Sequence, residues 1–184
     1  MQATEQLKTE HNAIKLMLRV LDAVADRLER GDSVDAADVN AIVEFIRVFA
    51  DRCHHGKEED HLFPALERAG LPRDGGPVGV MLAEHDLGRE FVRGLAEGAS
   101  RLSDGSSEAA AQVVRNARGY ADLLRQHIDK EDNILYEIAD FHLDAREDAR
   151  LVEEFERVER ERVGPGRHEE FHQLLHDLRD RYLS

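Results

Sequence analysis

The chain has 184 residues and carries 39 acidic against 25 basic side chains, which gives a formal net charge of -14 at neutral pH. This charge argues against binding to nucleic acid or to an anionic membrane surface, because phosphate groups would be repelled. Aromatic residues make up 5% of the chain, tryptophan is absent and there are four prolines, a composition typical of packed amphipathic helices. We therefore expect one all-α domain spanning residues 1–184.

Residues 1–8 contain no apolar core like that of a signal peptide, and no apolar run approaches the length needed to span a membrane. A single cysteine, Cys53, excludes an intramolecular disulfide. We expect a cytoplasmic protein that does not associate with membranes.

Hydrophobic periodicity predicts a first helix over residues 7–28, with His11 inside its buried stripe and Gly31 at its end. Asp35 is expected to cap a second helix, which runs through a histidine-rich stretch to the loop over residues 70–77. That loop divides the chain into two similar halves.

The third helix repeats the buried stripe of the first at an offset of 74 residues, so that His85 takes the place of His11. The fourth helix is expected to begin at a Ser107 cap. Its inward face is expected to include Tyr120, Leu124, His127, Glu131 and Ile134.

A charged fifth helix over residues 143–163 and a short sixth helix over residues 167–183 are separated by Gly164-Pro165-Gly166. We expect an up-down four-helix bundle over residues 4–141 and an extension of two additional C-terminal helices over residues 143–184. Three histidines of the sixth helix, at positions 168, 172 and 176, are interpreted as its polar edge.

One pattern, His-x-x-Lys-Glu-acid-x-x-Leu-aromatic, occurs at residues 54–63 and again at residues 127–136. Helix residues four apart lie on one face, so the His and the Glu of each copy can point to the same spot. Imidazole and carboxylate groups from facing helices form metal sites in helical bundles. A helical wheel starting at Ile46 turns His55 about 180° away, so His55 and the neighbouring Glu59 are expected to face outward.

Mixed nitrogen and carboxylate ligands suit iron or manganese, and such a set would also bind zinc. Without a metal, these inward groups would be buried and uncompensated, at a cost of several kcal/mol each. The candidate metal ligands are His11, His54, Glu58, His85, His127 and Glu131.

Several neighbouring residues have roles that the sequence leaves open. Glu10, Glu84 and Lys57 either orient the ligands or are solvated helix residues. Asp132 lies five residues after His127 and, in an alternative helix register, would be the inward acid of the fourth helix. Four further residues are candidates for extra ligands or hydrogen-bond donors, and Tyr120 is favoured among the tyrosines because it lies on the inward stripe: His61, Tyr120, Tyr136 and His142.

The ordered elements Glu10-His11, His54 to Pro64, Glu84-His85 and His127 to Glu131 resemble the hemerythrin-like family, also called the HHE cation-binding domain. The resemblance implies a four-helix bundle that holds two iron ions joined by an oxo or hydroxo bridge. Carried over by motif position, the ligands are the six candidates given above, with Glu58 and Glu131 bridging the two ions.

The pattern of the oxygen-carrying members of that family includes a second histidine one turn after the third-helix histidine. At that position this chain has Arg89. The departure favours the bacterial branch associated with nitric oxide, iron-centre repair and oxidative stress. We expect a di-iron protein that binds or reacts with oxygen, peroxide or nitric oxide in a stress response, with turnover or autoxidation instead of reversible oxygenation.

The sequence is also compatible with two alternative functions. The first is a non-catalytic iron sensor or store that signals through a protein partner, which the sequence does not identify. The second is a structural metal bundle, for which zinc would suffice.

Overall fold

The computed structural model describes residues 1–164 and 166–183, and the regular elements in these ranges are helical. In chain order, with π-helical and 3₁₀ segments labelled η, they are α1 (Gln2–Glu29), α2 (Ala36–Phe45), η1 (Ile46–His55), η2 (Glu58–Leu62), α3 (Phe63–Arg68), α4 (Pro77–Ser100), η3 (Leu102–Asp104), α5 (Ser107–Lys130), η4 (Glu131–Leu135), α6 (Tyr136–His142), α7 (Ala145–Val158), η5 (Glu159–Val163) and α8 (Arg167–Tyr182).

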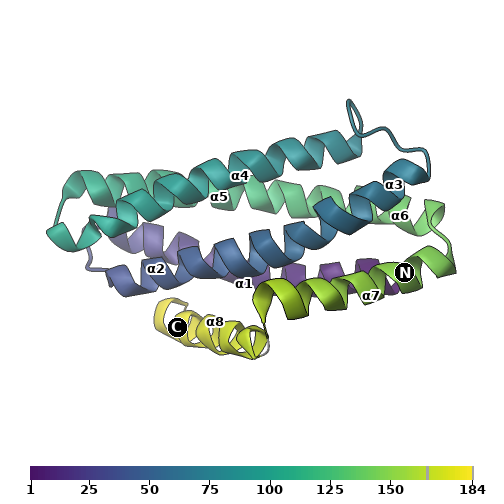
Figure 1. The fold of residues 1–184 in the computed structure, drawn as a ribbon. Coiled ribbons are helices and arrows are strands. Elements are labelled where there is room, and N and C mark those ends of the chain that lie inside the picture. The colour runs from purple at the N-terminus through teal and green to yellow at the C-terminus, as the bar shows by residue number, and fades with distance from the viewer. Residues whose placement is uncertain (165, 184) are drawn as a thin grey trace.

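Four long rods run side by side, with α7 and α8 along one flank (Figure 1). The rods are α1, the continuous run from α2 to α3, α4, and the continuous run from α5 to α6. The expected all-α four-helix bundle with additional C-terminal helices is confirmed. Among the described residues, no helix combines the length and the apolar character that crossing a membrane requires.

The helix ends follow from the local sequence, with one expected cap displaced. The Asp35 side chain accepts a hydrogen bond from the backbone N–H of Ala37 and caps α2, as expected. The cap of α5 is Ser106, whose hydroxyl accepts from Ala109, and not Ser107. Gly31 follows α1 with a φ of 79°, a conformation that favours glycine.

Two apolar clusters fill the bundle at different heights along its axis. One contains Ile14, Phe49 and Leu124, and the other contains Leu7, Phe63 and Leu135. Between these heights, α1 carries His11 and the fourth rod carries the segment from His127 to Glu131. The candidate ligands therefore form a polar layer enclosed by apolar packing at both ends.

Three π-helical segments, η1, η2 and η4, lie in this layer, and they change which residues face inward. A π-helix turns by about 80° per residue instead of 100°, so the nine steps from Ile46 return His55 nearly to the direction of Ile46. His55 is only 4% exposed, so the expectation that it faces outward is wrong. The same effect in η4 leaves Ile134 52% exposed and buries Leu135 instead.

The C-terminal helices pack against α1. Asp148 of α7 accepts hydrogen bonds from the backbone N–H groups of Gln2 and Ala3, both at 2.9 Å, and so satisfies free donors at the start of α1. The buried face of α8 includes Phe171 and Leu175. The extension is thus tied to the bundle by both polar and apolar contacts.

Candidate metal centre

All six candidate ligands from the sequence lie together in the polar layer, and each is at most 1% exposed. They come from all four rods. Their positions are His11 on α1, His54 on η1, Glu58 on η2, His85 on α4, His127 on α5 and Glu131 on η4.

The four histidines form two pairs through their Nε2 atoms. The Nε2 atoms of His11 and His54 are 3.0 Å apart, and those of His85 and His127 are 3.1 Å apart. In each pair, one residue comes from a rod that carries a Glu-His motif and the other from a rod that carries the longer repeated motif. The twofold repeat in the sequence therefore corresponds to a twofold arrangement of imidazoles.

The other ring nitrogen of each histidine faces a carboxylate. The Nδ1 atom of His54 lies 2.8 Å from Glu10 and that of His127 lies 2.9 Å from Glu84. A carboxylate at Nδ1 accepts the ring proton, so the Nε2 lone pair is directed into the layer, as metal-binding histidines require. Glu10 and Glu84 therefore orient histidines and are not merely solvated.

The remaining two histidines follow the same rule. The Nδ1 atom of His11 is 2.7 Å from Asp132, and the Nδ1 atom of His85 is 2.7 Å from Glu59. Asp132 is thus a partner of His11 in this structure. Glu59 was expected to turn away from the site, and this expectation is wrong because its carboxylate reaches His85.

The lysine in each motif copy has a specific place. Lys57 is fully buried and donates to Glu10, the carboxylate that holds His54. Lys130 donates to Glu84, the partner of His127. Each lysine thus compensates the carboxylate that orients the histidine three residues before it, which gives the His-x-x-Lys spacing a physical reason.

Glu131 reaches both histidine pairs. Its Oε2 atom is 3.2 Å from Nε2 of His11, and its Oε1 atom is 3.0 Å from Nε2 of His127. Glu58 also lies between the pairs, because its Oε2 atom is 3.5 Å from His85 and 3.8 Å from His54. These two carboxylates connect what would otherwise be separate ligand sets.

The residues fit a metal on the structure's own evidence. The Oε2 atom of Glu58 and both carboxylate oxygens of Glu131 are buried without a hydrogen-bond partner, although His11 and His127 lie within ion-pair distance of Glu131. Such atoms are costly to bury unless they are paired or bind a cation. The ligand atoms fall into two groups, and within each group all of them lie within 4.8 Å of one another. One group consists of His11, His54 and Glu131, and the other consists of His55, Glu58, His85 and His127.

The buried ionisable groups of the layer shift one another's pKa values. Burial and the neighbouring Glu131 raise the pKa of Glu58 well above its ordinary value. Burial alone would raise the pKa of Glu131, but His127 and His11 hold it well below its usual range. Burial lowers the pKa of His54 to about 4, whereas Glu131 and Glu84 overcome burial and raise the pKa of His127 to about 9.

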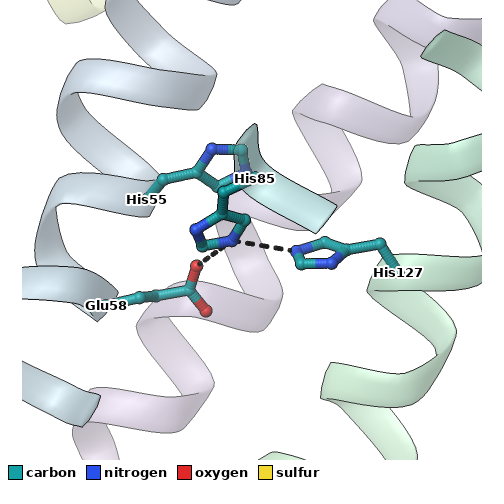
Figure 2. A group of neighbouring side chains, drawn as sticks. All are labelled: His55, Glu58, His85 and His127. Carbon is teal, nitrogen blue, oxygen red and sulfur yellow. Dashed lines mark hydrogen bonds and ion pairs between the residues drawn. The ribbon is translucent and has the colours of Figure 1, made fainter. Parts of the chain in front are cut away.

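His55 is the residue at this site that sequence reasoning excluded. Figure 2 shows its ring beside that of His85, together with Glu58 and His127. The rings of His55 and His85 are stacked, with centroids 3.8 Å apart and planes 14° apart. The π-helical stretch before it brings it inward, and a wheel drawn for an ordinary α-helix gives no signal of this.

The other candidates separate clearly. Tyr136 donates a 2.7 Å hydrogen bond from its hydroxyl to Oε1 of Glu58, although Tyr120 was the favoured tyrosine. His61 lies 3.7 Å from Glu154 of α7, and it belongs to neither ligand group among the described residues. His168 and His172 pack near Phe49, also outside both groups.

A pocket of about 190 Å³ leads to one side of the layer, at His55 and His85. Its wall includes Arg47, Arg89 and Arg93 as well as apolar side chains. Tyr120, which is 2% exposed, lies in this wall. A cavity of this volume admits small molecules, and its wall also includes Asp51, which pairs with Arg89.

Replacing Glu10 with glutamine is expected to weaken metal binding about 10- to 100-fold, because the variant loses the charged acceptor that orients His54. The measurement is a metal titration of the chelator-treated protein. Glu5→Gln is the matched control on the same helix, since the Glu5 side chain is 71% exposed. Equal affinities for Glu10→Gln and wild type would show that Glu10 does not support a ligand.

The sequence matches the model of the hemerythrin HHE cation-binding domain over residues 2–139. It is also similar to uncharacterized proteins from Mycobacterium bovis and from two strains of Mycobacterium tuberculosis, with 26% identity over 162 residues in each case. The matches cover 88% of this chain and 63% of each relative, so the chain spans less than two thirds of their length. No solved structure matches the chain.

Proposed function

Because this chain belongs to the hemerythrin HHE cation-binding family, we propose that it holds two iron ions and that this pair binds or reacts with oxygen, peroxide or nitric oxide. His11 and His54 would hold one ion, and His85 and His127 the other. The proposal includes a role in oxidative or nitrosative stress and the cytoplasmic location expected from the sequence. Manganese or zinc would fit the same ligand types.

The observation that carries this proposal is the position of Glu131. Its two oxygens face different histidine pairs at 3.2 and 3.0 Å, which is the placement a bridging carboxylate needs. Glu58, between the same pairs, would be the second bridge. Two ions held this close can act on one small molecule.

A pair of ferrous ions supplies two electrons when both become ferric, which is what the reduction of one peroxide to two waters requires, together with two protons. Tyr136 is suited to pass a proton, because its hydroxyl already donates to Glu58 within the layer. Arg89 is engaged by Asp51 and Glu59 through 2.7 Å hydrogen bonds and supplies no ligand. The positioned proton of Tyr136 favours reaction over reversible oxygen carriage.

The pocket supports a small substrate. Its volume of about 190 Å³ is below that of sites that enclose drug-sized organic molecules. Oxygen, peroxide and nitric oxide are all small enough to enter.

The test begins with anaerobic loading of ferrous iron, followed by admission of oxygen and repeated removal of the gas. We expect oxidation that removing the gas does not reverse, followed through the near-ultraviolet absorption of the ferric protein. Tyr136→Phe should keep the bound iron and slow oxidation about 100-fold, the range for a positioned proton donor. A stable adduct that forms and releases over many cycles would identify a carrier and defeat this proposal.

Tyr182→Phe is the matched control for that variant. Its hydroxyl also donates a 2.7 Å hydrogen bond to a buried carboxylate, that of Asp38, but at the α8 end of the molecule. The oxidation rate of this control should equal that of the wild type. Equal slowing in both variants would point to a general loss of stability.

One observation favours the alternative role as an iron sensor. Lys57, which supports the Glu10–His54 pair, also donates a 2.6 Å hydrogen bond to Glu159 of η5. A change in the charge around His54 would therefore reach the C-terminal extension through three contacts, His54–Glu10, Glu10–Lys57 and Lys57–Glu159. Faster proteolysis of the extension in the metal-free protein than in the iron-loaded protein would support this role.

A further inference from the structure

We propose that His55 is an additional metal ligand, which makes the His85–His127 position a three-histidine site. The inference rests on the proposed metal centre and deepens it, because His55 is not among the six residues that the family resemblance assigns. It would be the fifth histidine of the centre.

His55 is buried, and one of its ring nitrogens has no partner. His55 is 4% exposed, and its Nε2 atom is buried without a hydrogen-bond partner. A buried polar nitrogen without a partner is unfavourable. A cation beside it would provide the missing interaction.

His55 lies close to three of the candidate ligands. A ligand atom of His55 lies within 4.8 Å of those of Glu58, His85 and His127. Two nitrogens bound to one ion at about 2.1 Å are at most about 4.2 Å apart. The 4.8 Å limit exceeds this separation by about 0.6 Å, so the farthest ligand atoms would have to approach by up to about that distance to share one ion. The view in Figure 2 shows His55 and Glu58 approaching from one rod and His127 from the opposite one.

The second ring nitrogen of His55 has a carboxylate partner. The Nδ1 atom of His55 lies 3.3 Å from Oδ1 of Asp51. Arg89 holds the same oxygen through its Nε at 2.9 Å and its Nη2 at 2.7 Å. With its ring proton on Nδ1, His55 presents the Nε2 lone pair to the layer, as the other four histidines do.

Arg89 stands where the pattern of the oxygen carriers has another histidine, and here it supports the partners of two histidines. It holds Asp51, the partner of His55, and it also donates a 2.7 Å bond to Glu59, the partner of His85. One guanidinium thus positions the carboxylates of two histidines. The imidazole missing from α4 is supplied by the neighbouring rod instead.

The two ions would then differ in coordination. With both glutamates bridging, the His85–His127 ion would have five protein ligands and the His11–His54 ion would have four. The two positions would therefore differ in affinity and be distinguishable in a metal titration.

The test is an anaerobic titration with Co²⁺, whose visible absorption depends on its coordination, of wild type and of His55→Phe. We expect two ions per wild-type chain. In His55→Phe, one ion should bind as in the wild type, while the other binds about 10- to 100-fold more weakly and with altered visible bands. His61→Phe is the matched control, because His61 lies on the same rod but belongs to neither ligand group.

A second variant removes the dependence on how well phenylalanine packs. In His55→Ala, added imidazole should restore the second ion and its visible bands, which a purely structural role would not produce. A His55→Phe protein that binds two cobalt ions as tightly as the wild type, with the same spectrum, would overturn the assignment of His55 alone. A wild type that binds no cobalt would overturn the metal centre itself.

Discussion

Replacement of Glu131 with alanine is expected to abolish binding of the paired ions and to reduce the affinity of each position at least about 100-fold. The reason is that each of its oxygens faces a different histidine pair, so a single substitution removes a ligand from both. Glu58→Ala should have a similar effect for the same reason. Elemental analysis after reconstitution with iron and removal of free metal measures the loss.

Glu137→Ala is the control for this experiment. Glu137 lies on the same continuous rod, but its side chain is 66% exposed and faces Lys8. It should retain the full complement of metal. If Glu131→Ala also retains two ions per chain, the bridging role assigned to Glu131 is incorrect.

Removal of the metals is expected to lower the melting temperature by roughly 15–30 °C. Each ion present at about 1,000 times its dissociation constant contributes about 4 kcal/mol to stability, and 1 kcal/mol corresponds to about 2–4 °C for a chain of this size. The cause is local, because the chelated protein retains buried oxygens of Glu58 and Glu131 without partners. Differential scanning calorimetry with and without a chelator measures the shift.

The Glu131→Ala protein provides the comparison for this measurement. Because each of its positions should bind at least about 100-fold more weakly, chelator should shift its melting temperature by less than half as much as that of the wild type. A wild type whose melting temperature does not respond to the chelator would mean that metal contributes nothing to the fold.

The bundle and the six candidate residues could be predicted because both depend on regular periodicity. His11 lies in a stripe of apolar residues, and the repeated motif places His127 and Glu131 four residues apart, where one helical turn brings them together. The partners of the ligands were harder to assign. Glu10 and Glu84 precede histidines in sequence, but they hold histidines of other rods, and only tertiary packing determines that exchange.

The errors about which residues face the site share one physical origin. The widened turns of η1 and η4 shift the register by a fraction of a turn, and this shift buries His55 and exposes Ile134. It also brings Tyr136, and not Tyr120, to a carboxylate of the site. Hydrophobic periodicity at 3.6 residues per turn cannot reveal such segments. The helices nevertheless widen where the ligands lie, which is common for π-helical segments at functional sites.

We propose above all that this chain holds a pair of iron ions between its four rods. The most direct measurement is the iron-to-protein ratio of the wild type, determined by elemental analysis and amino-acid analysis after anaerobic loading with ferrous iron and removal of unbound metal. The proposed centre predicts two iron ions per chain. A ratio of one, or of zero, would contradict it.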